Sequence, residues 1–275
     1  MTKFISFASS SRGNCTFVSY KNTNLLIDCG ISRKRVVNAL EKYNKTLDDI
    51  DCILLTHSHD DHISGLPMIL KEHDIKLMSQ RETLEKVLKL CNEKGIKVNT
   101  ESFRIVRPVN ILNADSYVKI KDINVYPLKG THDVPSLYFK LALGDTNIAV
   151  LTDMGEYSDY TIRSLEDVSH LMLECNYDKE MLMDSEVYKP MLKSRIMGRG
   201  GHLSNVDCSE IIMKLSTGFL KNVFLSHISD ETNSEEYAFE FVNKYLKEKA
   251  TSNLILPKVE ISRRLEITEI INDDN

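Results

Sequence analysis

The feature that most constrains this chain is the segment His57-Ser58-His59-Asp60-Asp61-His62, which directly follows a short apolar run. The run at residues 52–56 reads CILLT, which is typical of a buried β-strand. Imidazole and carboxylate groups bind zinc, manganese or iron at neutral pH, and alternate residues at the end of a strand point the same way. The segment therefore predicts a metal site at the end of a strand, and a polar surface loop is the less favoured alternative.

One loop cannot supply all the ligands of two ions, so further ligands are expected after other strands. His132, Asp153 and His227 each come at or just after the carboxyl end of a predicted strand, as the first motif does. A single histidine in such a place is usually structural, but three equivalent positions beside an existing motif favour ligands. The predicted metal ligands are His57, His59, Asp61, His62, His132, Asp153 and His227.

Apolar periodicity divides the chain into strands and helices, and we find neither a Pro/Gly/Ser-rich linker nor an internal repeat. Strands are predicted over residues 3–8, 16–20, 24–28, 52–56, 170–175, 222–226 and 258–267, with strand-rich segments over 117–128 and 137–151. Helices are predicted over residues 32–43, 81–94, 205–215 and 234–247, with another beginning near residue 64. Hairpins mixed with strand–helix units predict an α+β fold of four layers, an αββα sandwich, formed by one domain over residues 1–275.

Composition limits the remaining possibilities. A net charge of −5 disfavours non-specific attraction to nucleic acid but leaves room for a local basic site. The six cysteines are scattered without a CxxC pair, which favours buried free thiols over a cysteine-based zinc finger. We find no apolar run of eighteen residues and no secretory signal pattern at the N-terminus, so we expect a cytoplasmic protein that has no contact with a membrane.

The order HxHxDH, then a histidine, an aspartate and a final histidine, resembles the signature of the metallo-β-lactamase superfamily. The resemblance implies that two divalent transition-metal ions are bound, zinc or manganese, with iron as another possibility. It implies two ligand groups and one bridge: His57, His59 and His132; Asp61, His62 and His227; and Asp153 between them. It also implies that Asp28 supports the metal loop without binding an ion.

Three further motifs are similar to those of the YycJ (WalJ) branch of this superfamily. They are SSSRGNC at residues 9–15, LECNYD at residues 173–178 and GHLSN at residues 201–205. That branch is associated with 5′→3′ exonuclease activity on DNA and is related to RNase Z and to small phosphodiesterases. Tyr177 departs from the pattern, since the branch usually has a histidine there.

The resemblance implies a metal-dependent phosphodiesterase whose partner is nucleic acid, with DNA ends as the substrate and no obligate protein partner. Two metal ions activate a water and brace the oxygens of a phosphodiester. By the resemblance, His202 is the general acid that protonates the leaving group, although a helix cap near Ser204 is its alternative role. Glu174 would hold the His202 ring in one tautomer, and Asp61 completes the predicted catalytic set.

Substrate phosphates also have to be held by hydroxyl, N–H or basic groups. The substrate-binding candidates are Ser9, Ser10, Ser11, Asn14, Lys193 and Arg195. A solvated helix face explains the basic residues equally well. The alternative function is hydrolysis of a small ester, thioester or lactone on the same fold, and an iron redox enzyme or a non-enzymatic module is less favoured.

Overall fold

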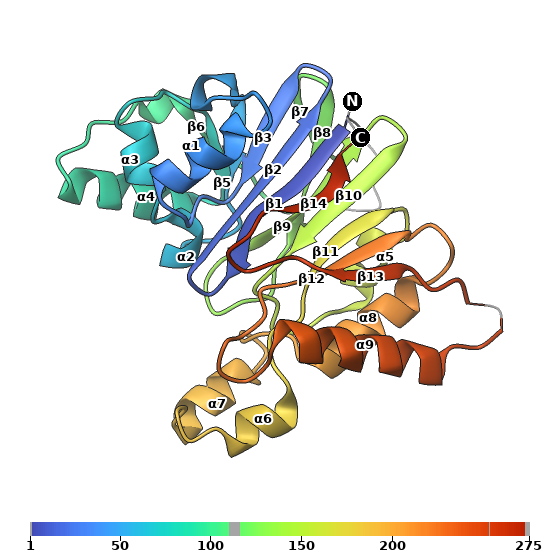
Figure 1. The fold of residues 1–275 in the computed structure, drawn as a ribbon. Helices are drawn as coiled ribbons and strands as arrows, with labels where there is room; N and C mark the ends of the chain where they lie inside the picture. Colours follow the sequence, from blue (N-terminus) through green and yellow to red (C-terminus); the bar gives the residue numbers. More distant parts are fainter. Residues whose placement is uncertain (1, 110–115, 253, 273–275) are drawn as a thin grey trace.

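Within the residues described by this computed structural model, 2–109, 116–252 and 254–272, fourteen strands form two mixed seven-stranded sheets. The sheets stack face to face, and helices cover the outer face of each (Figure 1). This arrangement confirms the predicted αββα sandwich. Residues 110–115, part of the segment between the predicted helix 81–94 and strand-rich 117–128, lie outside the described residues.

Each sheet combines antiparallel hairpins with parallel strands joined through helices. The first sheet has the spatial order β14 (Thr268–Asn272), β1 (Thr2–Ser10), β2 (Gly13–Tyr20), β3 (Thr23–Ile27), β4 (Cys52–Leu54), β5 (Leu77–Ser79) and β6 (Phe103–Ile105). The second has the order β13 (Lys258–Ile261), β12 (Asn222–Ser226), β11 (His170–Glu174), β10 (Thr146–Leu151), β9 (Leu137–Leu143), β8 (Ile123–Lys129) and β7 (Val118–Ile120).

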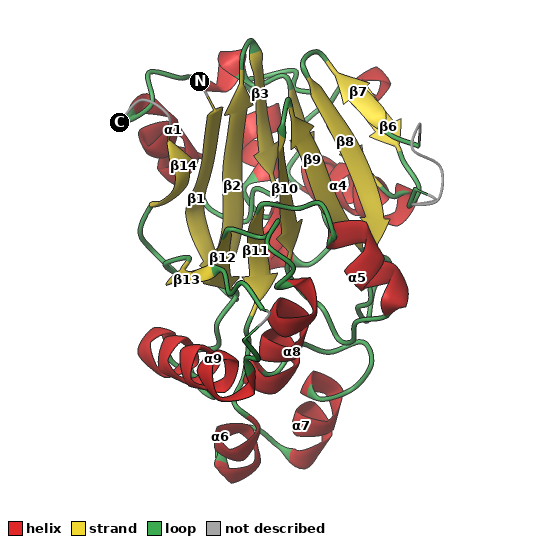
Figure 2. Ribbon diagram, turned by 90° about the vertical axis from the view of Figure 1, so that its right-hand side faces the viewer, coloured by secondary structure: helices red, strands yellow, loops and turns green. Residues whose placement is uncertain are grey.

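The helices divide between the two outer faces, apart from two that project from the body. The first sheet is covered by α1 (Arg33–Glu41), α3 (Leu66–Leu70) and α4 (Arg81–Glu93), with the short α2 (Asp60–Ile63) at its end. The second is covered by α5 (Asp159–Leu165), α8 (Asn205–Leu215) and α9 (Glu235–Lys249). The projecting helices, α6 (Lys179–Asp184) and α7 (Pro190–Ile196), form an arm over residues 179–196 (Figure 2).

Central strands are buried on both faces, which explains their uninterrupted apolar runs. In β12, Phe224 packs between the sheets, whereas Val223 and Leu225 pack against the helices of the outer layer. Three separate cores result, one between the sheets and one under each helical layer. Among the described helices, none is long and apolar enough to cross a membrane.

The predicted last strand, residues 258–267, is wrong beyond Ile261. The chain leaves the second sheet there and returns as β14, which pairs antiparallel with β1 of the first sheet. Arg263 and Arg264 hold the crossing segment against the start of α9, because the Arg264 N–H donates to Glu235 Oε1 at 3.0 Å. The helix expected near residue 64 is also split, since α2 already begins at Asp60.

The core between the sheets gives a test of stability. We expect Phe224→Ala to lower the free energy of unfolding by about 3–5 kcal/mol, because the ring is 1% exposed and its loss leaves a cavity. The matched control is Phe219→Ala, whose ring is 66% exposed and whose loss should cost less than about 0.5 kcal/mol. Urea unfolding followed by circular dichroism measures both, and equal losses would contradict this account of the core.

Candidate metal centre

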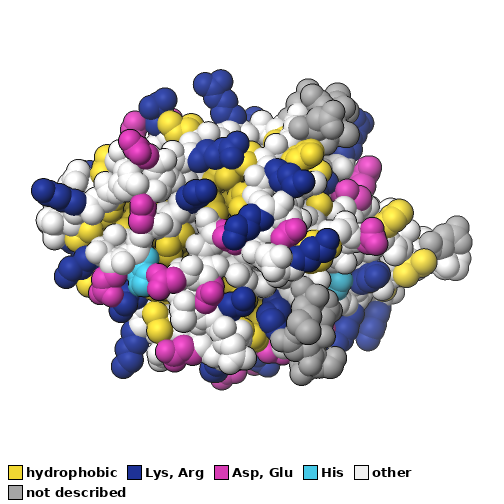
Figure 3. All heavy atoms as spheres, turned by 90° about the horizontal axis from the view of Figure 1, so that it is seen from above, with side chains coloured by type: hydrophobic (Ala, Val, Ile, Leu, Met, Phe, Trp, Pro, Cys, Tyr) yellow, Lys and Arg dark blue, Asp and Glu magenta, His cyan; other side chains and the backbone are white. Residues whose placement is uncertain are grey.

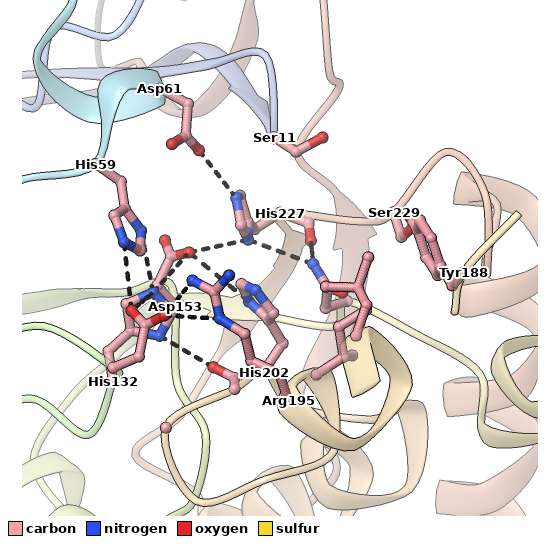
Figure 4. A pocket seen from close by; sticks show the side chains of 16 residues that line it. Ser11, His59, Asp61, His132, Asp153, Tyr188, Arg195, His202, His227 and Ser229 are labelled. Atoms are coloured by element: carbon pink, nitrogen blue, oxygen red, sulfur yellow. Dashed lines mark hydrogen bonds and ion pairs between the residues drawn. The ribbon is translucent and has the colours of Figure 1, made fainter. Parts of the chain in front are cut away.

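The predicted ligands meet at one end of the sandwich, where strands of both sheets finish. β4 of the first sheet leads to His57, whereas β8, β10 and β12 of the second lead to His132, Asp153 and His227. Figure 4 shows these last three side chains directed toward one another with His59 and Asp61 around a pocket. The pocket has a volume of about 250 Å³.

Local backbone conformation turns several of these residues toward the pocket. Asp28, Asp153 and His227 follow strands and have φ angles of 58°, 56° and 51°, in the left-handed region that non-glycine residues rarely occupy. Such residues cost of order 1–3 kcal/mol each and persist where the surrounding structure holds them. Their concentration at this end of the sandwich indicates a site for which the fold accepts strain.

A close backbone approach fixes the loop that carries Asp61 and His62. Gly30 lies so near that a Cβ atom there would be 1.5 Å from the carbonyl oxygen of Asp61. The Cys29 N–H donates to the His62 carbonyl oxygen at 2.8 Å in the same contact. Only a glycine allows the two segments to pack in this way.

The donor atoms of the seven candidates form overlapping groups, each with its atoms within 4.8 Å of one another. The groups are His57, His59 and His132; Asp61, His62 and His227; and His57, His62 and Asp153. Asp153 lies between the first two groups, since its Oδ2 is 3.0 Å from His62 Nε2 and its Oδ1 is 3.8 Å from His132 Nε2. Asp153 therefore lies within reach of both groups.

Hydrogen bonds set the orientation of four of the five histidines through their Nδ1 atoms. The Nδ1 contacts are His57 to Thr56 Oγ1 at 3.0 Å, His62 to Asp28 Oδ2 at 2.8 Å, His132 to the Gly201 carbonyl at 3.1 Å and His227 to Glu174 Oε1 at 2.8 Å. A partner at Nδ1 fixes both the ring and its tautomer and leaves Nε2 for a metal ion. Asp28 thus supports His62 without facing the centre.

The unpartnered atoms fit a pair of cations. Among the described residues, the buried Nε2 of His57 has no hydrogen-bond partner, and that of His227 has only a long contact of 3.5 Å with Asp61 Oδ2. A buried group of this kind costs about 1–3 kcal/mol, which a bound ion would offset. Burial, reinforced by the charge of His62, lowers the pKa of His57 well below its usual value, so its ring is neutral and able to bind a metal.

The carboxyl group of Asp153, which lies beside these histidines, is ionised. Burial alone would raise the pKa of its carboxyl, but the charges of His227 and His62 outweigh burial and hold that pKa well below its usual value. A carboxylate that is 2% exposed requires compensating positive charge. The centre therefore combines the neutral imidazole of His57 with the buried carboxylate of Asp153, and imidazole and carboxylate are donors that suit zinc or manganese.

Glu174 lies against the second ligand group but has no oxygen left for an ion. Its Oε1 accepts from Nδ1 of both His202 and His227, each at 2.8 Å. Its Oε2 accepts from the backbone N–H groups of Met154 at 2.7 Å and Leu203 at 3.1 Å. Although Asp153, Glu174, His202 and His227 also lie close enough to form a ligand group, these four bonds indicate a hydrogen-bonded cluster instead.

The serine-rich turn between β1 and β2 braces the centre more than it faces the pocket. Ser9 Oγ accepts from the His227 N–H at 2.9 Å, and Ser10 Oγ accepts from the Arg12 N–H at 3.2 Å. Asn14 Nδ2 lies 3.2 Å from Asp61 Oδ2. Three of the predicted substrate-binding residues thus touch the protein's own loops, and Ser11 lines the pocket.

The two basic candidates, Lys193 and Arg195, make different contacts. Arg195 lines the pocket and binds Asp133 with its guanidinium group. Lys193 is not among the pocket-lining residues, and its Nζ donates to the Met183 carbonyl within the arm. Of the predicted basic pair, only Arg195 is placed to meet a bound substrate.

Several other residues at the pocket were not predicted as site residues from the sequence. Asn176 Nδ2 donates to the His227 carbonyl at 2.8 Å, and Tyr188 and Leu192 of the arm line the pocket mouth. Asp133 lies against His59 and His132. The signal for Asp133 was its position next to a predicted ligand, and Asn176 lies within the LECNYD motif.

The model of the β-lactamase superfamily domain matches residues 23–228 of the chain. The chain belongs to this superfamily. Among curated members, it is 29% identical over 238 residues to exodeoxyribonuclease WalJ of Streptococcus pneumoniae serotype 2, covering 86% of this chain and 85% of WalJ. It is 27% identical over 247 residues to exodeoxyribonuclease YycJ of Bacillus anthracis, covering 90% and 89%.

Solved structures agree on the fold of this superfamily member. The metallo-β-lactamase fold protein YhfI from Bacillus subtilis superposes with a TM-score of 0.68 at 15% identity, covering 98% of this chain and 100% of YhfI. The comparisons confirm the predicted family and fold. Together with the relatives' names they also confirm the predicted enzyme class, a hydrolase of the metallo-β-lactamase type.

Metal analysis tests the centre. Protein purified without chelators should contain about two transition-metal ions per chain by inductively coupled plasma mass spectrometry. Asp153→Ala should lose more metal than His59→Ala, because a bridging carboxylate serves both ions. The control is His73→Ala, whose ring binds Asp48 outside the centre and whose loss should leave both ions in place. Full metal content in Asp153→Ala would contradict the bridging assignment.

Proposed function

We propose that this β-lactamase superfamily protein is a metal-dependent phosphodiesterase that acts as a 5′→3′ exonuclease on DNA. One observation carries the proposal: Glu174 Oε1 holds His202 through its Nδ1 at 2.8 Å beside the seven predicted metal ligands, of which His202 is not one. An oriented histidine that binds no ion is suited to proton transfer. The DNA substrate rests on similarity to WalJ and YycJ, which are named exodeoxyribonucleases. The 5′→3′ direction rests on the resemblance of the motifs at residues 9–15, 173–178 and 201–205 to that branch.

The seven ligands would hold two divalent ions, which lower the pKa of a water and neutralise the oxygens of a phosphodiester. His202 then supplies a proton to the leaving oxygen. Its Nδ1 donates to Glu174, so Nε2 is the nitrogen left for the substrate. Burial lowers the pKa of His202, but the charge and hydrogen bond of Glu174 outweigh it and raise that pKa, which favours the protonated form.

The position of His202 suits this role. Its ring centroid lies 5.3 Å from that of His132 and 5.5 Å from that of His227, so it stands beside one ligand of each group. Its side chain is 23% exposed, which allows contact with a substrate in the pocket. Phosphate recognition is expected at the pocket rather than on the face in Figure 3, where Lys and Arg are interspersed with Asp and Glu.

Leaving-group dependence tests the role of His202. His202→Ala should keep both ions and the fold, while its turnover of a diester with an alkyl leaving group falls roughly 10²–10⁴-fold. A nitrophenyl diester needs little protonation and should be affected much less. Equal losses on both substrates would rule out leaving-group protonation, and loss of metal would assign His202 a structural role.

Glu174 gives a contrasting variant. Because its Oε1 holds both His202 and His227, Glu174→Gln should combine a weaker loss of proton transfer with a weaker hold on the second ion. The two variants therefore differ in metal content as well as in rate.

End-labelled substrates test the reaction itself. With Mn²⁺ or Zn²⁺ added, 5′-labelled DNA should release a labelled nucleotide at once, while 3′-labelled DNA should shorten progressively and keep its label. RNA of the same sequence serves as a comparison, and each nucleic acid is tested in single-stranded and in double-stranded form. Release from the 3′ end first would overturn the direction. Turnover of small esters, thioesters or lactones with no cleavage of nucleic acid would favour the alternative hydrolase.

A further inference from the structure

Asp133 lines the pocket and contacts two histidines of the first ligand group. Its Oδ1 lies 3.3 Å from His59 Nε2 and 3.4 Å from His132 Nε2. The other nitrogen of His59, Nδ1, lies 3.2 Å from His132 Nε2, so it is the nitrogen of that ring that faces the neighbouring donor. Asp133 Oδ1 therefore lies at the His59 nitrogen that does not face this neighbouring donor, and it also lies close to His132 Nε2.

His59 differs from the other four candidate ligands in a way that makes this contact necessary. Those four are held through Nδ1 by the protein, whereas His59 presents Nδ1 to the centre and needs a partner at Nε2. The His59 side chain is also 32% exposed, so packing constrains it less than the buried His57 and His62. Among the described contacts, Asp133 is the carboxylate at that nitrogen.

The second oxygen of Asp133 reaches the arm. Its Oδ2 accepts from Arg195 Nε at 3.0 Å and also from Nη2 of the same guanidinium group. Figure 4 shows the Arg195 side chain directed from α7 toward the histidines. The carboxylate is thus held on both sides.

We propose that Asp133 is a positioning residue that joins the metal centre to the arm. Through Oδ1 it favours the His59 tautomer with its proton on Nε2 and Nδ1 free for the first ion. Through Oδ2 it holds Arg195 at the pocket. The three histidines that lie within 4.8 Å of one another form their group without Asp133, which favours an orienting role over ligation. The inference rests on the proposed metal centre.

A chelator challenge of the metal-loaded protein tests the positioning role of Asp133. The variants are Asp133→Ala and Asp133→Asn, the second of which keeps one acceptor oxygen. The matched control is Glu156→Gln, which removes a carboxylate from another arginine pair outside the pocket lining, where Glu156 Oε1 accepts from Arg199 Nε at 3.0 Å. The midpoint chelator concentration for metal loss is measured for each ion, with thermal unfolding recorded in parallel.

We expect Asp133→Ala to hold one ion about 10–100-fold more weakly, with Asp133→Asn between it and the wild type, and Glu156→Gln within about twofold of the wild type. The Co²⁺-substituted protein should keep the intensity of its visible bands, because the ligands are unchanged. If Asp133→Ala does not fold, Asp133→Asn decides.

Metal retention in the Asp133 variants equal to that of Glu156→Gln would overturn this inference alone. A changed coordination number in the Co²⁺ spectrum would also overturn it, because Asp133 would then be a ligand. A wild-type chain that holds no ion would overturn the proposed function together with this inference.

Discussion

The rest of the site depends on the hydrogen bonds that fix the histidine rings at the ends of the strands. A hydrogen bond at one nitrogen of an imidazole orients the ring and leaves the other nitrogen for a metal, and here Thr56, Asp28, a backbone carbonyl and Glu174 make that bond. Each partner belongs to the same half of the sandwich as the ring that it holds, Thr56 and Asp28 with the first sheet and Gly201 and Glu174 with the second. The rings are therefore oriented within each half, and stacking of the two halves brings the candidate ligands together.

Glu174 illustrates how one buried carboxylate serves two purposes. It orients a ligand, His227, and the proposed acid, His202, with the same oxygen, while two backbone N–H groups hold the other oxygen. The proposed proton transfer and the proposed metal binding would thereby be held in a fixed spatial relation. The strain in the backbone of Asp153 and His227 is consistent with this demand, because both residues turn sharply where the strands end.

The sequence predicted the parts of the structure that depend on local pattern. The strand before His57, the strands before Asp153 and His227, and helix α8 all follow from apolar periodicity, and α8 has the predicted bounds. The contact of the Asn14 side chain with Asp61 could not be predicted, because it depends on how a hairpin packs against a loop 47 residues away. Asp133 was missed for the same reason, since its partner Arg195 lies 62 residues further along. The β14 crossing depends on charge pairs of Arg263 and Arg264, which apolar patterning does not reveal.

The candidate ligands come from both sheets, and this has a consequence for the stability of the fold. Because the first sheet supplies His57 to His62 and the second supplies His132, Asp153 and His227, each bound ion would act as a cross-link between the two halves of the sandwich. Ligand binding to the folded state alone raises its stability in proportion to the logarithm of the free ligand concentration. The folding equilibrium of this protein would then follow the metal supply of its surroundings, and metal depletion would loosen this end of the sandwich first.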